Sequence, residues 1–226
     1  MDLLLGFLLG LGLAAAAGLR VFVPLLIAGL AARFGHLELI PSLAWLSATP
    51  VLVGLALATL LEVLAYQIPW LDHLLDTVAT PLAVVAGTLL MAAFMLDLPP
   101  VWRWALALIA GGGAAGLVQA TTVGLRLASA GATGGLGNPV LAAGESGGAL
   151  ALGLLAVLLP LLAGLLVLLL LGLGVRRLLR PRILRNHLIP DDTWSELRTQ
   201  HPILKGFTPA DEQRLRALAT LFLHEK

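Results

Sequence analysis

Two arginines lie within or beside apolar stretches and are the first candidates for chemistry. Arg20 lies inside the run from Leu3 to Ala32, where a guanidinium costs on the order of 2.5–3.5 kcal/mol on insertion scales, so it must have a partner. That partner is either an anion or substrate at an interrupted helix or a carboxylate in a buried ion pair, with Glu62 as the candidate. Arg126 has the same two interpretations and a third, which we expect, in which its side chain snorkels to the external headgroups.

Three acidic residues form a second group of candidates. Glu62 follows the uncharged run from Leu43 to Leu61. Asp72 and Asp76 share one face if the stretch around them is helical. Acidic side chains within a membrane indicate a cation or proton pathway. The alternatives are an ion pair with Arg20 for Glu62 and a water-exposed external loop for the Asp pair.

Little in the sequence suits a metal ion or a catalytic group. His73 is expected to be interfacial, and the chain has no Cys, so we predict no metal site and no cofactor. No hydrolase elbow, His-Glu-x-x-His motif or phosphate-binding loop is present, and Ser146 has no base beside it. The chain as given is therefore predicted not to be an enzyme.

The composition indicates which elements must position these residues. Of the 226 residues, 59% are hydrophobic and 12% are charged, with a mean hydropathy of +0.97, whereas soluble domains carry about 25% charged residues. The apolar residues come in runs and not at amphipathic spacing, so lipid is the solvent that fits them. We predict an all-α, polytopic helical membrane protein.

A helix that crosses a membrane needs about 20 apolar residues, and about five segments meet this need. They are Leu3 to Ala32, Leu43 to Ala65, Val78 to Leu96, Trp104 to Ala120 and Gly148 to Gly174. Since basic loops stay in the cytoplasm, the C-terminal tail and the loops with Arg33 and Arg103 are placed inside. An odd number of crossings then puts the N-terminus outside, in the inner (cytoplasmic) membrane of a cell.

Two stretches interrupt the apolar runs and are candidates for re-entrant turns that face the interior of the bundle. The first is Gly18 to Arg20 with Pro24, and the second is the Gly-, Ala- and Thr-rich stretch from Thr121 to Pro139. Both contain Gly-Leu-Arg, which ends at Arg20 in the first and at Arg126 in the second. This echo is either chance in a chain rich in Gly and Leu or an inverted repeat of the kind found in transporters.

The chain is predicted to divide into a transmembrane helical domain, 1–175, and a basic cytoplasmic tail, 176–226. The tail holds ten of the fourteen Lys and Arg residues. We expect the cluster from Arg176 to Arg185 to meet anionic lipid and not nucleic acid, because juxtamembrane basic residues usually serve topology and lipid binding. Besides the bilayer, a second copy of the chain is a candidate partner. Separately, Gly111, Gly112, Gly113 and Gly116 give a helix surface on which another backbone can pack closely, which we interpret as architecture.

A helix with one apolar stripe is predicted near the C-terminus, from Pro209 to about His224, with Thr208 as its cap. The stripe consists of Leu215, Leu218, Ala219 and Phe222. A short helix cannot bury such a stripe by itself. Because the chain ends at Lys226 without a helix stop signal, we expect a fragment or a truncation of a longer membrane-tethered fusion.

A family pattern runs through the residues before the tail. It consists of Gly18-Leu19-Arg20, Pro24-Leu25-Leu26, Gly29-Leu30, Glu62, Ile68-Pro69, Asp72, Asp76, Gly87, a Gly-Gly run, Arg126, Asn138 and Glu145. In this order the chain resembles domain-of-unknown-function family 4126, a group of bacterial membrane proteins, over residues 1–175. The resemblance implies a multi-span membrane protein with no settled activity. It also adds Asn138 and Glu145 to the candidates for binding a substrate or an ion.

The chain departs from the pattern of that family at several positions. Tyr66-Gln67 stands where the family shows Asp-Lys, and Ala83-Val84 stands where it shows Arg-Pro. Ser146 replaces a second acid after Glu145. If these charged pairs carry the function of the family, this member has lost part of the set.

The tail carries a second, shorter resemblance. His201 to Leu204 and Arg214 to Lys226 look like the opening of zinc peptidases of the Mlc-titration-factor type. Those enzymes have their zinc motif well downstream of this opening, and the chain ends before any such motif. No catalytic residue is carried over.

These observations support two functions. The first is a transporter or channel-like protein for a small solute or ion, with an interior polar site. The candidate residues of that site are Arg20, Glu62, Asp72, Asp76, Arg126, Asn138 and Glu145. The second function is a membrane anchor or scaffold for a cytoplasmic, peptidase-like domain or partner. A solvated cavity that reaches Arg20 is required by the first function and not by the second.

Overall fold

Every regular element in the described part of the chain is a helix. The structure is a computed structural model that describes residues 2–68, 72–201, 204 and 207–224. Its helices are α1 (Leu3–Ala17), α2 (Phe22–Arg33), the 3-10 helix η1 (Pro41–Ser47), α3 (Thr49–Ala65), α4 (Asp72–Ala93), α5 (Pro100–Leu106), the π-helical turn η2 (Ala107–Gly112), α6 (Gly113–Thr133), α7 (Asn138–Leu158), α8 (Pro160–His187), α9 (Asp191–Gln200) and α10 (Pro209–His224). The predicted all-α class is confirmed.

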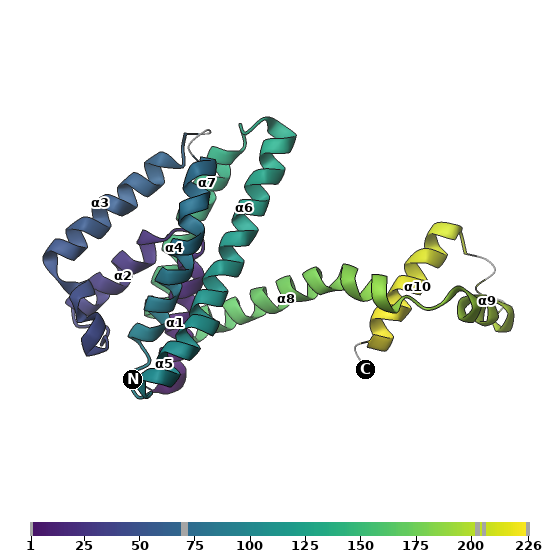
Figure 1. Ribbon diagram of the computed structural model, residues 1–226, viewed down its shortest axis with the longest axis horizontal. Coiled ribbons are helices and arrows are strands. Elements are labelled where there is room, and N and C mark those ends of the chain that lie inside the picture. Colours follow the sequence, from purple (N-terminus) through teal and green to yellow (C-terminus); the bar gives the residue numbers. More distant parts are fainter. Residues whose placement is uncertain (1, 69–71, 202–203, 205–206, 225–226) are drawn as a thin grey trace. The chain divides into compact units, whose positions relative to one another are not determined.

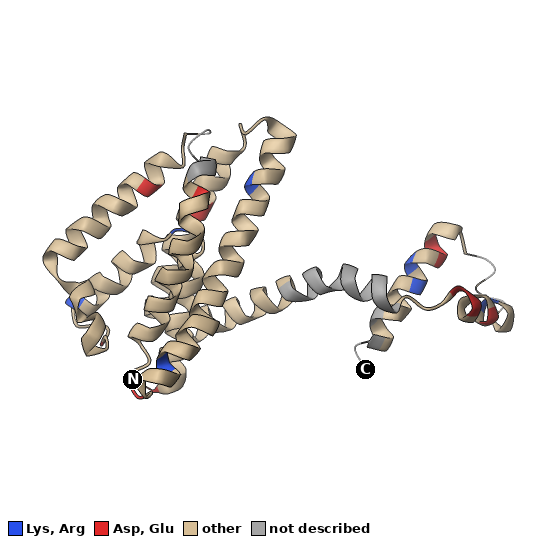
Figure 2. Ribbon diagram, in the orientation of Figure 1, with Lys and Arg blue, Asp and Glu red and all other residues tan. Residues whose placement is uncertain are grey.

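Two compact units make up the chain, Met1–Leu169 and Leu170–Lys226. The first unit contains α1 to α7 and the start of α8 (Figure 1), and the second contains the rest of α8 with α9 and α10. Charged residues are sparse along the helices of the first unit and denser on α9 and α10 (Figure 2). The apolar first unit is the part that suits a bilayer.

Three of the described helical stretches are long and apolar enough to cross a membrane: Leu75–Ala93, Pro100–Thr133 and Asn138–Leu158. A fourth span is added if η1 and α3, which meet at an angle of 64°, are taken together. Leu3–Ala17, Phe22–Arg33 and Pro160–Gly174 are shorter apolar helices. The chain is thus a helical membrane protein, with three or four such spans among the described residues where the sequence indicated about five.

The first apolar segment, Leu3 to Ala32, was counted as one crossing with an interruption, and in the structure it turns back on itself as two short helices. Gly10 of α1 lies against Met91 near the end of α4. After α2, the Ile40 N–H donates to the Ala93 carbonyl at 3.0 Å. The start of α1 and the loop after α2 therefore lie at the same end of the bundle (Figure 1).

The predicted interruption between Gly18 and Arg20 is confirmed, and its residues explain it. A Cβ at Gly18 would lie 2.4 Å from the Ala115 carbonyl oxygen and 2.7 Å from the Val118 Cβ, so only a glycine fits between α1 and α6. Pro24 lies in the first turn of α2, where a backbone N–H would have no partner within the helix. The chain can thus end one helix and begin the next without strain from Pro24.

The second predicted interruption is much shorter than the sequence indicated. Thr121 to Pro139 was expected to break the helix, but α6 continues to Thr133 and α7 begins at Asn138. Gly134 ends α6 in the left-handed conformation, with φ of 63°, which is the usual role of a glycine after a helix. The stretch is helical although a Cβ at Gly124 or Gly131 would meet nothing within 4 Å, so close packing on these glycines is not the cause. Its alanines are the best helix formers and offset the lower propensity of Gly and Thr.

The last apolar segment is also divided. Gly148 to Gly174 was predicted as one span, but α7 ends at Leu158 and α8 begins at Pro160. Pro160 has no N–H and clashes with the carbonyl four residues earlier in a continuous helix. The proline therefore accounts for the break.

Glycines set the close packing at the centre of the first unit, where α4 meets η2. A Cβ at Gly87 would lie 2.7 Å from the Gly111 carbonyl oxygen, and a Cβ at Gly111 would lie 2.5 Å from the Gly87 carbonyl oxygen. The two backbones are in direct contact, as in small-residue helix interfaces of membrane proteins. The small residues of this region thus serve packing within the chain.

The second unit is held together by polar contacts around α10. The Arg216 side chain donates to the Ile189 carbonyl and pairs with Asp191. The predicted helix from Pro209 to His224 is confirmed, and Thr208 caps it by accepting the Asp211 N–H at 3.3 Å. Leu218 and Phe222 of the predicted apolar stripe are 55% and 61% exposed, so most of their surface is uncovered.

Candidate functional site

Arg20 is placed by the break between α1 and α2 and points toward α7. Its Nε donates to the Ser146 Oγ at 2.9 Å, and its Nη2 donates to the Ala142 carbonyl at 2.8 Å. Its Nη1 lies 3.2 Å from the Glu145 Oε2 in an ion pair. With only 1% of the residue exposed, Arg20 joins the helix break to one turn of α7.

An ion pair with Arg20 was one of the two interpretations of Glu62, and the contacts of Glu62 in α3 are different. Its carboxylate accepts the N–H of Val21 at 2.8 Å and the N–H of Phe22 at 3.2 Å. These amides lie at the start of α2 and have no partner within that helix. The N-terminal end of a helix also carries roughly half a positive charge. The helix end and not the guanidinium therefore holds this carboxylate.

Arg126 lies inside the bundle, so the prediction that it snorkels to external headgroups is wrong. It is 2% exposed, and its guanidinium forms ion pairs with Asp76 of α4 and Glu145 of α7. The error came from ending the fourth segment at Ala120, whereas α6 continues to Thr133. Arg126 thus bridges two helices through their carboxylates.

Tyr66, directly after α3, completes the cluster, and sequence reasoning missed it as a site residue. Its hydroxyl donates to the Asp76 Oδ1 at 3.0 Å. The Arg20 and Arg126 guanidinium carbons lie 4.0 and 4.1 Å from the centre of its ring, within the range of cation–π contacts. Its position one helical turn after Glu62 was a signal that could have found it, since residues four apart share a helix face.

These six residues form one buried ionic network. Its members are Arg20, Glu62, Tyr66, Asp76, Arg126 and Glu145. They come from the α1–α2 break and from α3, α4, α6 and α7. With all groups ionised, the three carboxylates exceed the two guanidinium groups by one negative charge. The positive N-terminal end of α2, which the Glu62 carboxylate contacts, offsets part of that charge.

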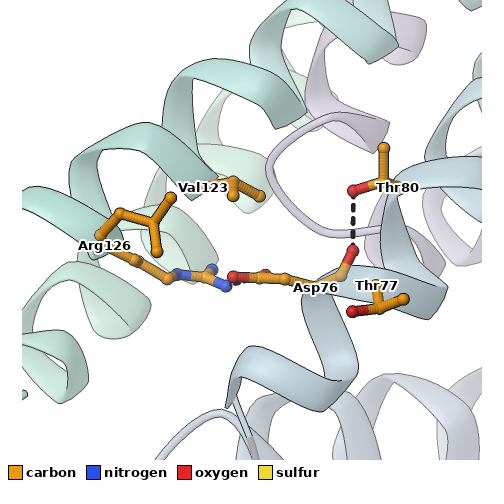
Figure 3. A pocket seen from close by; sticks show the side chains of 6 residues that line it. Asp76, Thr77, Thr80, Val123 and Arg126 are labelled. Carbon is orange, nitrogen blue, oxygen red and sulfur yellow. Dashed lines mark hydrogen bonds and ion pairs between the residues drawn. The ribbon is translucent and has the colours of Figure 1, made fainter. Parts of the chain in front are cut away.

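A cavity of about 220 Å³ lies at one side of the network. It is lined by Asp76, Thr77, Thr80, Val123, Arg126 and Leu127. Figure 3 shows Arg126 reaching from α6 toward the Asp76 carboxylate, with Thr77 and Thr80 beside Asp76 on α4. The Thr80 hydroxyl donates to the Asp76 backbone carbonyl at 2.7 Å. The cavity thus meets the network at Asp76 and Arg126, whereas Arg20 is not among the lining residues.

Asn138 and Asp72 are the remaining predicted site residues. Asn138, the first residue of α7, is 1% exposed. Asp72 begins α4, but its side chain and that of His73 lie outside the described part, as do the side chains of the Arg176 to Arg185 cluster. In the described residues no group of three or more His, Asp or Glu is placed to hold a metal ion.

Comparison with known proteins gives a family and nothing finer. Searches of the curated proteins and of the solved structures found no match to this chain. A model of the family described as "Domain of unknown function (DUF4126)" matches residues 7–180. The match covers α2 to α7 completely, and with them every member of the ionic network. The chain therefore belongs to the DUF4126 family of proteins.

Proposed function

We propose that this protein is a transporter or channel-like protein for a small ion or charged solute. The observation that carries the proposal is the buried ionic network with a cavity at its Asp76 and Arg126 side. We expected the cavity of a transporter to reach Arg20. This cavity does not, but it reaches Arg126, which shares the Glu145 carboxylate with Arg20. Ionisable residues inside a membrane are expensive and commonly mark the path of an ion or a substrate. A broken helix that turns back beside the network, as at Arg20, is a common feature of transporter sites.

A purely structural role explains the network less well. Replacing a buried ion pair by apolar side chains of similar volume is often neutral or stabilising. Five charged side chains and a tyrosine are therefore a costly way to join helices that already meet through small apolar residues such as Gly87 and Gly111. A path for ions would account for the presence of these buried charges.

We further propose an orientation in the cytoplasmic membrane. Arg33 and Arg103 lie toward the end of the bundle where α2 and α4 end, and basic loops favour the cytoplasm. The start of α1 lies at that end too, because the first segment turns back. The N-terminus is thus proposed to be cytoplasmic, which revises the orientation drawn from an odd number of crossings.

The transport proposal is tested with the full chain reconstituted in liposomes on a solid-supported membrane. Jumps of Na⁺, K⁺, methylammonium or H⁺ are applied, and the displaced charge is recorded. We expect a current with at least one of these ions that falls to the background of protein-free liposomes in Asp76→Asn.

The matched control is Asp97→Asn, which makes the same chemical change at an exposed residue between α4 and α5. This variant is expected to keep the current of the wild type. A wild-type signal equal to that of protein-free liposomes for all four ions would rule out electrogenic transport of these cations by this chain.

The second unit favours one alternative, a membrane anchor or scaffold. Leu170–Lys226 forms a compact unit of its own, with contacts such as the ion pair between Arg198 and Glu212 at 2.9 Å. In this alternative the tail, with its peptidase-like opening and its basic cluster toward anionic lipid, binds a cytoplasmic partner or domain. Deleting residues 188–226 would then remove partner recovery in crosslinking, whereas a transporter would keep its current without them.

A further inference from the structure

We infer that the cavity beside Asp76 is a binding site for a small monovalent cation, which takes the Asp76 carboxylate from Arg126. The inference rests on the proposed function and names its substrate class. In the exchange, the cation replaces Arg126 as the charged partner of Asp76. In the structure, the Asp76 Oδ1 accepts the Tyr66 hydroxyl at 3.0 Å and pairs with Arg126.

The charge of the network favours a cation over an anion. Both guanidinium groups are already paired with carboxylates, Arg20 with Glu145 and Arg126 with Asp76 and Glu145. An anion would have to displace one of these carboxylates and would add to an excess of negative charge. A monovalent cation brings the formal charge of the network to zero, which lowers the cost of burying it.

Of the three carboxylates, Asp76 is the one that lines the cavity. Glu62 is held by the two amides at the start of α2. Glu145 receives both guanidinium groups. A cation that enters from the cavity therefore meets Asp76 first.

The other lining groups suit a small cation. The Thr80 hydroxyl donates its hydrogen to the Asp76 backbone carbonyl. Its oxygen can therefore act toward a ligand only as an acceptor, and oxygen acceptors are the atoms that hard cations bind. Val123 and Leu127 give the cavity an apolar side that a methyl group can contact. A volume of about 220 Å³ is below the range of roughly 300–1,000 Å³ for drug-sized ligands.

Arg126 can give up Asp76 without being left unpaired. Its Nη2 pairs with Glu145 while its Nη1 pairs with Asp76. When a cation takes Asp76, the Arg126 guanidinium keeps its Glu145 contact and its place at the Tyr66 ring. Glu145 also pairs with Arg20. A change in the Arg126 contacts when the cavity is occupied therefore reaches the break between α1 and α2 through Glu145.

The test measures the melting temperature of the purified full chain in detergent against increasing NaCl, KCl or methylammonium chloride. Ionic strength is kept constant with N-methyl-D-glucamine chloride, whose cation is much larger than the three that are tested. A ligand that binds the folded state raises the melting temperature with a saturable dependence on concentration. We expect such a rise with at least one of the three salts, and the salt that gives it identifies the cation.

Four variants check the site. Asp76→Asn and Val123→Phe are expected to lose the rise, the first by removing the charge and the second by narrowing the cavity beside Asp76 while every charge remains. Asp97→Asn, in the exposed loop, is expected to keep it. Arg126→Gln removes the competitor of the cation and is expected to lower the half-saturating concentration by about tenfold.

The inference is overturned if none of the salts gives a saturable rise, or if Asp76→Asn and Val123→Phe keep the rise of the wild type. An unchanged half-saturating concentration in a folded Arg126→Gln variant would contradict the exchange. A saturable rise without any current in liposomes would support the site and reject transport. A current that survives Asp76→Asn would support transport and reject this site.

Discussion

At the scale of single residues, Arg20 has the most demanding set of contacts. One guanidinium reaches the Ser146 hydroxyl, the Ala142 carbonyl and the Glu145 carboxylate. All of these partners lie on α7, so the side chain fixes one turn of that helix against the α1–α2 break.

We therefore predict that Arg20→Ala destabilises the protein by on the order of 3 kcal/mol, the lower end of the cost of breaking a buried pair, because Glu145 keeps Arg126. Arg33→Ala is the matched control. Arg33 is exposed and donates one bond, to the Ser47 carbonyl at 3.2 Å, so its loss should cost at most about 1 kcal/mol. Apparent melting temperatures in detergent measure both variants. Equal values for the two would remove Arg20 from the network.

Arg20→Lys extends the same prediction. A lysine ammonium is a point charge and cannot reproduce the fork of donors that reaches three groups. We expect this variant to recover less than half of the loss in melting temperature caused by Arg20→Ala. Recovery to the wild-type value would mean that charge alone matters at this position.

The hydroxyl contact and the ring contacts of Tyr66 can be measured separately with two substitutions. Tyr66→Phe removes the hydroxyl that donates to Asp76 at 3.0 Å and should cost about 0.5–1.5 kcal/mol. Tyr66→Leu also removes the ring from both guanidinium groups and should cost more, by about 0.5–2 kcal/mol for each cation–π contact. Thermal melts of the two variants compare these losses, and an equal loss would show that the ring contacts contribute nothing.

The sequence predicted which residues would be buried in the network better than it predicted their partners. Arg20 was recognisable because a charge in an apolar run must be satisfied. Its partners were not, since Ser146 follows Arg20 by 126 positions and is brought close by the packing of α1 and α2 on α7. Arg126 was misjudged because Gly and Thr suggested a loop where α6 continues.

At the scale of elements, the contact between α4 and η2 depends on Gly87 and Gly111, whose backbones touch. Gly113 lies only two positions after Gly111, but its surroundings are completely different. A Cβ at Gly111 would lie 2.4 Å from the Met91 Cβ and 2.5 Å from the Gly87 carbonyl oxygen, whereas a Cβ at Gly113 would meet nothing within 4 Å.

We predict that Gly111→Ala costs about 1–3 kcal/mol through overpacking and that Gly113→Ala is neutral or stabilising by up to about 1 kcal/mol. Melting temperatures of the two variants provide the measurement, and each serves as control for the other. A stable Gly111→Ala variant would show that α4 and η2 can separate without cost.

Helix ends were the elements least accessible to sequence reasoning. Hydropathy identifies apolar runs but not the direction of the chain within them, so one run from Leu3 to Ala32 concealed α1 and α2. Glycine gave the correct position of the break at Gly18, whereas the break at Pro160 was missed inside the run from Gly148 to Gly174. At other helix ends the packing of neighbouring helices determines where the helix stops, and the local sequence does not encode that packing.

At the scale of the whole molecule, the reversal of the first segment changes the expected topology. The start of α1 and the loop after α2 lie at one end of the bundle. The loop between α6 and α7, with Leu136 at 82% exposure, belongs to the other end, because α6 separates it from α5 (Figure 1).

The absence of native Cys makes this topology testable with single Cys substitutions. We predict that an impermeant thiol reagent added to intact cells labels Leu136→Cys and does not label His36→Cys, which lies in the exposed loop after α2. Permeabilised cells serve as the control, in which both sites should react. Labelling of His36→Cys in intact cells would reverse the proposed orientation.

The contacts of Arg20 also bear on how the protein is synthesised. Its partners Ala142 and Ser146 follow it by 122 and 126 residues, which takes roughly 6 to 25 s at a rate of 5–20 residues per second. During that interval the nascent chain carries an arginine in an apolar segment without the hydrogen-bond and ion-pair partners that α7 supplies. The guanidinium must therefore stay in water or at the headgroups until α7 emerges from the ribosome. The hairpin of α1 and α2 is made first and completes its contacts only after α7 has been inserted.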